Sequence, residues 1–95
     1  MLQENIMFMD MVYPKNNAKI FIPRELDGSS GSSVFELSHR DANATVFWHL
    51  EGKYMGSTKA VHNMALNPGE GKHVLTAVDE AGRTIERHFE VISKM

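Results

Sequence analysis

The chain has 95 residues, the length of a single domain, since domains usually have about 50 to 250 residues. Apolar residues make up 42% and charged residues 23% of it, which is typical of a globular domain and excludes a disordered segment. Ten Lys and Arg against twelve Asp and Glu, with no basic run, argue against a nucleic-acid partner. We expect no membrane span and no export signal within the chain, and the lack of cysteine excludes disulfides and thiolate chemistry.

The first half of the chain has the pattern of short strands, with no sustained helical periodicity. The run 6–13 is apolar on both faces apart from Asp10, and Pro14 separates it from a second run at 19–22, which predicts a split first strand. The Gly- and Ser-rich stretch 26–32 predicts a long loop within the domain. Strands are then predicted at 33–38 and 45–50.

The second half continues the pattern. Glu51 and Gly52 are a candidate two-residue hairpin turn before a strand at 53–57, and further strands are predicted at 60–66, 73–79 and 84–91. Trp48 shares a face with Val46 and Leu50, which indicates a core anchor. The sequence therefore predicts one all-β module over 1–95, an immunoglobulin-like β-sandwich of seven to eight antiparallel strands without a disulfide.

Four histidines fall on or beside predicted strands of the middle sheet: His39, His49, His62 and His73. They would be the ligands of a metal site, and a small metal-dependent hydrolase built on them is one alternative function. Their spacing is not that of a zinc hairpin and no cysteine contributes, so we expect structural or exposed histidines, with no metal and no cofactor. His73 follows Gly71 at a strand edge, where we expect a hydrogen bond to a neighbouring loop.

Two further functions are conceivable from the residue types present: nucleophilic catalysis by serine and sugar binding by aromatic rings. The serines at 29, 30, 32 and 33 lie in a flexible loop without a Gly-x-Ser-x-Gly elbow, so we expect no nucleophilic catalysis and no catalytic residue. Trp48 and Tyr54 would stack on a sugar ring if both were exposed, which leaves an independent glycan- or peptidoglycan-binding module as an alternative. The inward phase of Trp48 favours the core instead.

Three alternating methionines, Met7, Met9 and Met11, form a stripe on the first strand. An exposed apolar strip usually marks an interface, and methionine side chains adapt to different partners. We therefore predict that this stripe is a docking surface.

Ordered segments from about Met11 to Val91 resemble a single family. They are YPKNNAKIFIP (13–23), LDG (26–28), FELSHR (35–40), FWHLEGKYMG (47–56), HNMAL (62–66), PG (68–69) and HVLTAVDEAG (73–82). They are similar to the C-terminal domain of bifunctional penicillin-binding protein 1C, in a style similar to that of the Bacteroidetes branch. The most specific pieces are the 48–56 hairpin and the 73–82 strand with its turn.

The resemblance implies a parent enzyme of cell-wall biosynthesis, anchored in the inner membrane, with a glycosyltransferase and a transpeptidase domain in the periplasm. The chain has no Ser-x-x-Lys, Ser-x-Asn or Lys-Thr-Gly set, so neither active site of the parent is expected here. What remains is a non-catalytic accessory or interaction domain. Family context suggests three partners: the transpeptidase domain of the same chain, peptidoglycan, or a periplasmic alpha-2-macroglobulin.

Overall fold

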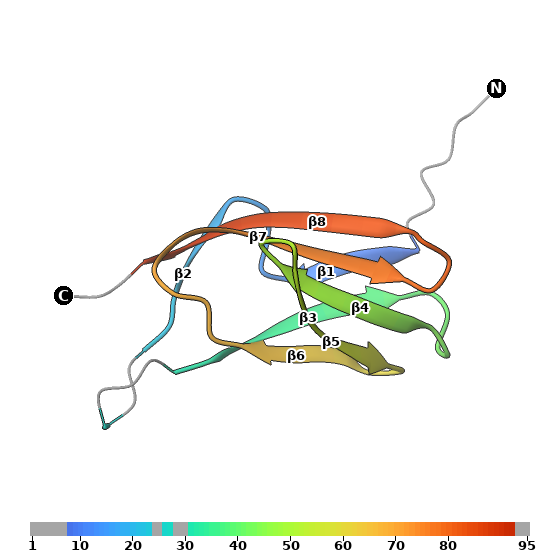
Figure 1. Cartoon of the computed structure of the whole chain (residues 1–95), viewed down its shortest axis with the longest axis horizontal. Coiled ribbons are helices and arrows are strands. Elements are labelled where there is room, and N and C mark those ends of the chain that lie inside the picture. The colour runs from blue at the N-terminus through green and yellow to red at the C-terminus, as the bar shows by residue number, and fades with distance from the viewer. Residues whose placement is uncertain (1–7, 24–25, 28–30, 93–95) are drawn as a thin grey trace.

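The computed structural model describes residues 8–23, 26–27 and 31–92, and within them every regular element is a β-strand. The strands are β1 (Met9–Tyr13), β2 (Ala18–Phe21), β3 (Ser33–His39), β4 (Thr45–Leu50), β5 (Lys53–Lys59), β6 (His62–Leu66), β7 (Gly71–Asp79) and β8 (Thr84–Ile92) (Figure 1). The predicted all-β class is therefore confirmed. The described part of the chain holds no helix with the length and apolarity to cross a membrane.

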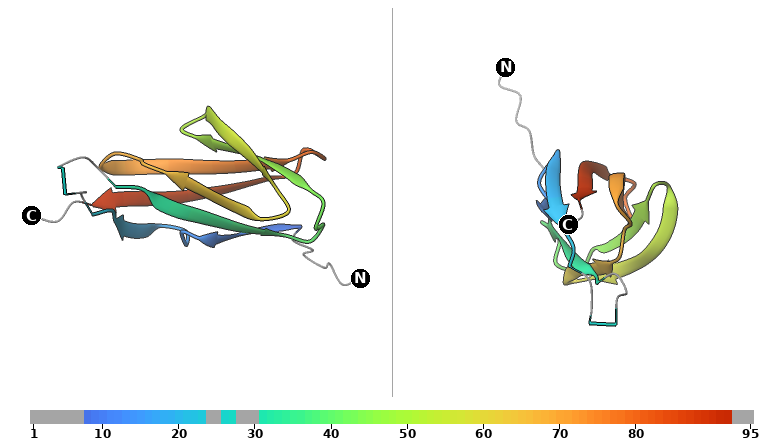
Figure 2. Two further views of the ribbon diagram at one scale, coloured as in Figure 1. Left: turned by 90° about the horizontal axis from the view of Figure 1, so that it is seen from below. Right: turned by 90° about the vertical axis from the view of Figure 1, so that its left-hand side faces the viewer.

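The strands form two sheets packed face to face, as Figure 2 shows. The three-stranded sheet has the order β1-β3-β6 and the five-stranded sheet the order β2-β8-β7-β4-β5. All pairings are antiparallel except that of β2 with β8, which is parallel, so the expectation of antiparallel strands throughout was wrong at this edge. The cause is the break at Pro14, after which the chain leaves the three-stranded sheet and joins the other beside its last strand.

The core lies between the sheets. Along β3, β4 and β7 alternate side chains are buried, as period-two sequences require. The largest side chains of the core have no exposed surface: Trp48, Phe35, Leu75 and Val46. The core thus includes Trp48 where the phase of its strand predicted it.

The turn between β4 and β5 is the predicted two-residue turn. Glu51 has φ 49° and Gly52 has φ 78°, so both residues are left-handed, as a type I′ hairpin turn requires. The β5 strand has an extra residue, Met55, opposite the step from Trp48 to His49 on β4, and the neighbouring Gly56 has φ 139°. A side chain at Gly56 would put its Cβ 3.3 Å from Cε of Met64, so the glycine allows β5 to approach β6.

Candidate functional site

Two residues of the methionine stripe, Met9 and Met11, are part of the core. Met9 is 6% and Met11 is 3% exposed, while Met7 lies outside the described residues. On β1 it is Asp10 and Val12 that point outward. Arg87 on β8 donates a hydrogen bond to the Met11 carbonyl at 3.3 Å, which covers the β1 edge from the second sheet. The docking prediction was therefore wrong for these two residues, because an apolar run cannot itself say which of its faces is buried.

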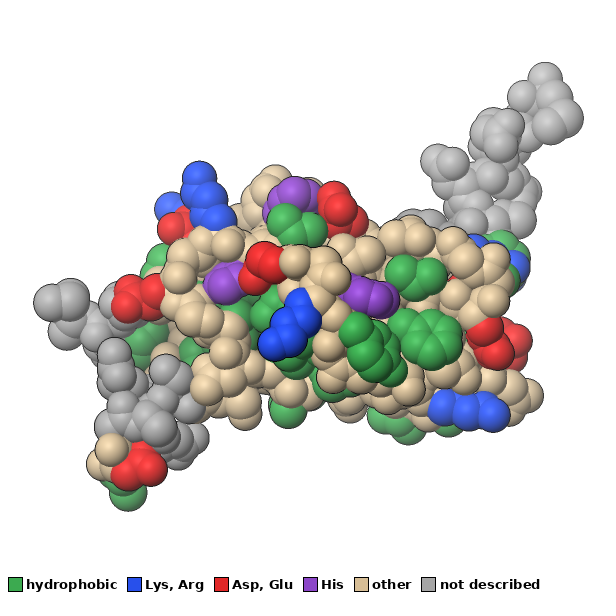
Figure 3. All heavy atoms as spheres, in the orientation of Figure 1, with side chains coloured by type: hydrophobic (Ala, Val, Ile, Leu, Met, Phe, Trp, Pro, Cys, Tyr) green, Lys and Arg blue, Asp and Glu red, His purple; other side chains and the backbone are tan. Residues whose placement is uncertain are grey.

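A different apolar surface lies on the outer face of the five-stranded sheet. In the register of the sheet, Phe47 on β4 pairs with Val78 on β7, and His49 on β4 pairs with Tyr54 on β5. Val74 lies on the same face of β7 as Val78. Figure 3 shows hydrophobic side chains and histidines gathered on this face. Tyr54 is 55% exposed and the other four are half-buried. We call these five residues the outer patch.

The aromatic rings of the described residues do not form a flat platform. Tyr54 contacts the His49 ring at 5.6 Å between centroids with a 58° angle between planes. Phe8 lies under the Arg83 guanidinium, 3.7 Å from ring centroid to Cζ, and the exposed Phe21 is on the far edge strand β2. The described residues thus offer no set of coplanar exposed rings on which several sugar units could stack.

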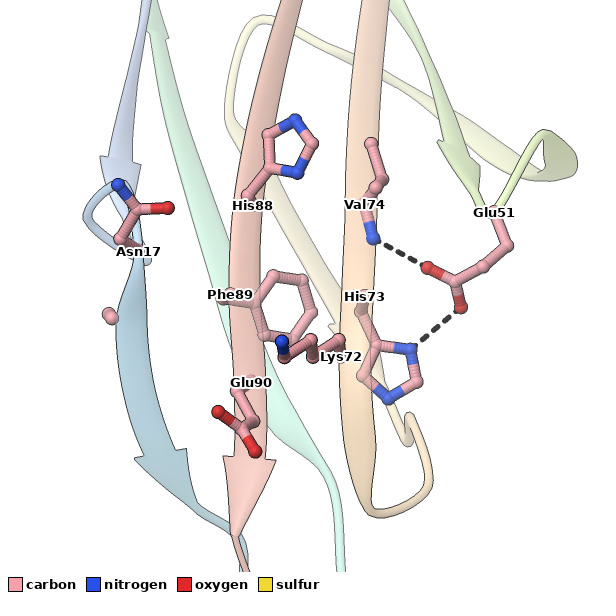
Figure 4. A pocket seen from close by; sticks show the side chains of 9 residues that line it. Asn17, Glu51, Lys72, His73, Val74, His88, Phe89 and Glu90 are labelled. Atoms are coloured by element: carbon pink, nitrogen blue, oxygen red, sulfur yellow. Dashed lines mark hydrogen bonds and ion pairs between the residues drawn. The ribbon is translucent and has the colours of Figure 1, made fainter.

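A hollow of about 440 Å³ lies beside the outer patch, between the β4–β5 turn and β2. It is lined by Asn17, Ala18, Glu51, Lys72, His73, Val74, His88, Phe89 and Glu90 (Figure 4). His73 lies on the side of the hollow next to the β4–β5 turn (Figure 4). Its Nδ1 is 2.7 Å from Oε1 of Glu51 and its Nε2 is 2.5 Å from the Gly69 carbonyl. The predicted hydrogen bond of His73 to a neighbouring loop is thereby confirmed.

A second polar cluster joins the two sheets at the end where β3 and β7 finish. Asp79 is buried and its Oδ2 is 2.9 Å from Nε2 of His39 and 3.0 Å from Nη1 of Arg83. Its Oδ1 accepts the backbone N–H groups of Ala81 and Arg83. Burial raises the pKa of Asp79, but the hydrogen bonds from His39 and Arg83 lower it more, to about 2.

The His39–Asp79 pair has the form of a catalytic acid–histidine pair but lacks its free nitrogen. The Asp41 backbone N–H points at Nδ1 of His39 from 2.9 Å, and because an N–H only donates, Nδ1 accepts. The hydrogen-bond network thus assigns the proton to Nε2, which donates it to Asp79. Both ring nitrogens are used within the fold, and the side chain is 2% exposed, so His39 has no nitrogen left to act as a base on a substrate.

Trp48 and His62 are joined by a buried hydroxyl. Nε1 of Trp48 donates to Oγ1 of Thr58 at 2.9 Å, and Thr58 is 2.7 Å from Nδ1 of His62. Because the hydroxyl oxygen accepts from the indole, its own hydrogen is free to donate to His62. Nε2 of His62 is buried without a partner among the described residues. Burial, followed by the nearby His39, lowers the pKa of His62.

The four histidines are divided between the two sheets, so their expected placement on one middle sheet was wrong. His39 and His62 lie in the three-stranded sheet, and His49 and His73 in the five-stranded sheet. Within residues 8–23, 26–27 and 31–92, no three His, Asp or Glu side chains converge in a metal-binding group. Of the serines considered as nucleophiles, Ser29 and Ser30 lie outside the described residues.

Sequence reasoning did not single out three residues on which these networks depend: Glu51, Thr58 and Asp79. Glu51 carried a local signal, because a type I′ turn favours Asn, Asp or Gly at its first central position and a glutamate there needs a reason. Asp79 accepts the N–H groups of Ala81 and Arg83, two and four residues further on, which is local turn chemistry. The bonds of Asp79 to His39 and of Thr58 to His62 carried no local signal, since they join the two sheets.

The overall fold identifies the structural class of the chain. The structure is similar to the fibronectin(III)-like modules of Clostridium thermocellum CbhA, with a TM-score of 0.62, 15% sequence identity, and coverage of 90% of this chain and 96% of that one. At this identity the likeness shows the fold alone, an immunoglobulin-type sandwich. The penicillin-binding protein C-terminus family matches residues 3–89, and the chain belongs to that family. No curated protein matches the sequence.

Proposed function

We propose that the chain is a non-catalytic accessory domain at the C-terminus of a bifunctional penicillin-binding protein of the 1C type, acting as an interaction module in cell-wall biosynthesis. Family membership over residues 3–89 carries the proposal. It suggests a cell-envelope protein, and we extend this to a periplasmic location beside an inner-membrane anchor supplied by the parent.

The absence of a catalytic role is supported by what the polar side chains already do. The nitrogens of His39 and His73 are both engaged within the fold, and Thr58 lies between Trp48 and His62. A hydroxyl nucleophile needs a base within hydrogen-bond reach and access to a substrate. The Thr58 hydroxyl does reach a nitrogen of His62, but the imidazole is buried, with His62 only 4% exposed, so this pair is closed off from a substrate. The sequence also lacks the transpeptidase motif set.

The outer patch supports the interaction role. The outer patch combines an aromatic residue at 55% exposure with a neighbouring histidine and three half-buried apolar side chains on the same face of the sheet, which is the composition of a protein interface. We propose the transpeptidase domain of the same polypeptide as its partner. A covalently tethered partner is present at an effective concentration in the millimolar range, so a patch of only five residues is enough to hold it.

The test is a binding titration of this chain against the separately expressed catalytic domains of its parent. We expect saturable binding that Tyr54→Ser weakens at least tenfold while Phe21→Ser, an exposed aromatic outside the patch, leaves it unchanged. Binding to purified peptidoglycan alone would favour the glycan-binding alternative, and binding only to a periplasmic alpha-2-macroglobulin would replace the partner. Incubation with labelled penicillin should give no covalent adduct, and a stoichiometric adduct on any serine would overturn the non-catalytic role.

A further inference from the structure

His73 faces an acceptor at each ring nitrogen. Nδ1 is 2.7 Å from the Glu51 carboxylate and Nε2 is 2.5 Å from the Gly69 carbonyl. Neither partner can donate a hydrogen bond to the ring. The first is a carboxylate, which already accepts the Val74 N–H, and the second is a backbone carbonyl. Both nitrogens therefore carry protons, and the side chain in this geometry is an imidazolium.

Glu51 is held in an unfavourable conformation by the same contacts. Its φ of 49° is left-handed, at a turn position that Asn and Gly occupy far more often. In return its Oε2 accepts the Val74 N–H at 2.6 Å, while its own N–H donates to the Val74 carbonyl at 2.9 Å. The carboxylate thus extends the pairing of β4 with β7 past the end of β4. The left-handed backbone of Glu51 costs conformational energy, and its contacts with His73 and Val74 offset that cost. We take this as a sign that these contacts have a role.

The surroundings of the ring are mostly closed. The His73 side chain is 11% exposed, and its ring stacks on Phe89 of β8 at 5.4 Å between centroids. The charged and titratable groups that share the hollow with it are Glu51 from the turn, Lys72 from β7, and His88 and Glu90 from β8. Of these, Glu51 alone is in hydrogen-bond contact with the ring, since His88 pairs with Glu86 at 3.0 Å.

We propose that His73 is a proton-operated latch, whose imidazolium ties the β6–β7 loop at Gly69 to the β4–β5 turn at Glu51 and whose deprotonation frees the loop. A neutral imidazole keeps one N–H. The carboxylate is the stronger acceptor, so the remaining proton stays on Nδ1 and the proton on Nε2 leaves to solvent. The Gly69 carbonyl then faces a lone pair, so the loop loses its hydrogen bond to His73 while the turn keeps its bonds to Val74.

The direction of the response follows from linkage. Burial lowers the pKa of His73, but the hydrogen bonds that its ring donates to Glu51 and Gly69, together with the charge of Glu51, raise it more, so the net shift is upward from 6.5. A group with a raised folded pKa stabilises the fold fully below its unfolded pKa and loses that contribution as pH rises through the folded pKa. The latch is therefore closed in mild acid and opens as pH rises through a midpoint above 6.5. It is independent of the domain's proposed partner.

The test is a pH titration of the 95-residue protein by NMR, which follows the His73 ring carbons and the backbone amides of Glu70 and Gly71. We expect the ring to titrate above 6.5 and the two amides to shift with the same midpoint. Glu51→Gln keeps a hydrogen-bond acceptor without the charge and should move both midpoints to lower pH. His88→Gln, a change to an exposed histidine in the same hollow, should move neither.

Three results would overturn the latch: a His73 midpoint at or below 6.5, loop amides that do not follow the ring, or a Glu51→Gln midpoint equal to that of the unchanged protein. If Glu51→Gln failed to fold, the His73→Gln variant gives the same decision. It should abolish the amide titration of Glu70 and Gly71, and amides that still titrated in it would report another group.

Discussion

Asp79→Asn should make stability at neutral pH markedly lower and remove a large part of its acid dependence. The carboxylate accepts hydrogen bonds from His39, from Arg83 and from two backbone N–H groups. Asparagine can keep the two backbone bonds through its carbonyl oxygen, but its NH₂ then faces the Nε2–H of His39 and the Arg83 guanidinium. Donors then face donors in a buried site, which we expect to cost about 3 kcal/mol at pH 7, near the lower end for breaking a buried pair because Arg83 is partly exposed.

The acid dependence gives an independent magnitude. The pKa of Asp79 falls from 3.8 to about 2 on folding, so its ionisation contributes about 2 kcal/mol, present above pH 3.8 and lost as pH falls to about 2. Urea unfolding of both proteins at pH 7, 5, 3 and 2.5 measures this. The difference in unfolding free energy should be largest at pH 7 and shrink below pH 4. A difference that stayed constant with pH would refute the reasoning, and Asp41→Asn, an exposed acid at the same end, should cost under about 1 kcal/mol throughout.

Three further outcomes follow from the core and its hydroxyl bridge. Trp48→Ala should cost roughly 3 to 5 kcal/mol in chemical denaturation, the range for truncating a buried large aromatic, and a loss below about 1 kcal/mol would mean that the ring is exposed in solution. Met9→Glu should prevent folding or cost more than about 3 kcal/mol by circular dichroism, because it buries a charge, whereas a folded and stable variant would restore the stripe as a surface. His62 has a folded pKa below 6.5, so the unfolded chain takes up its proton first and stability is lost as pH falls from 6.5 through the folded pKa. His62→Gln should therefore lose less stability than the unchanged protein between pH 7.5 and 5, and an equal loss in both would assign the acid sensitivity to other groups.

The local sequence pattern was enough to predict the strands and the turn between β4 and β5. The limits of β4 and the Glu51-Gly52 turn agree with the prediction, because alternation and turn chemistry depend on residues next to one another. The alternation also identified the buried side of β4, because Val46 and Trp48 share one face and are buried, whereas Thr45, Phe47 and His49 on the other face are only partly buried.

The same pattern could not assign strands to sheets. Period two gives the face of a strand and not its neighbour, so the parallel β2–β8 pairing and the division of the histidines between sheets were beyond it. The run 6–13 was apolar on both sides and left the burial of Met9 and Met11 undetermined. The His39–Asp79 bond joins residues 40 positions apart, so only the packed sheets bring them together.

Site-specific photo-crosslinking in the full-length parent tests the interaction role most directly. A photoreactive residue replaces Tyr54 in the outer patch in one variant and Phe21 on β2 in the other, since both side chains are about half exposed. The proposed role predicts that position 54 crosslinks within the same polypeptide to the transpeptidase domain and that position 21 does not. Equal crosslinking from both positions, or crosslinking from position 54 only to other molecules, would contradict it.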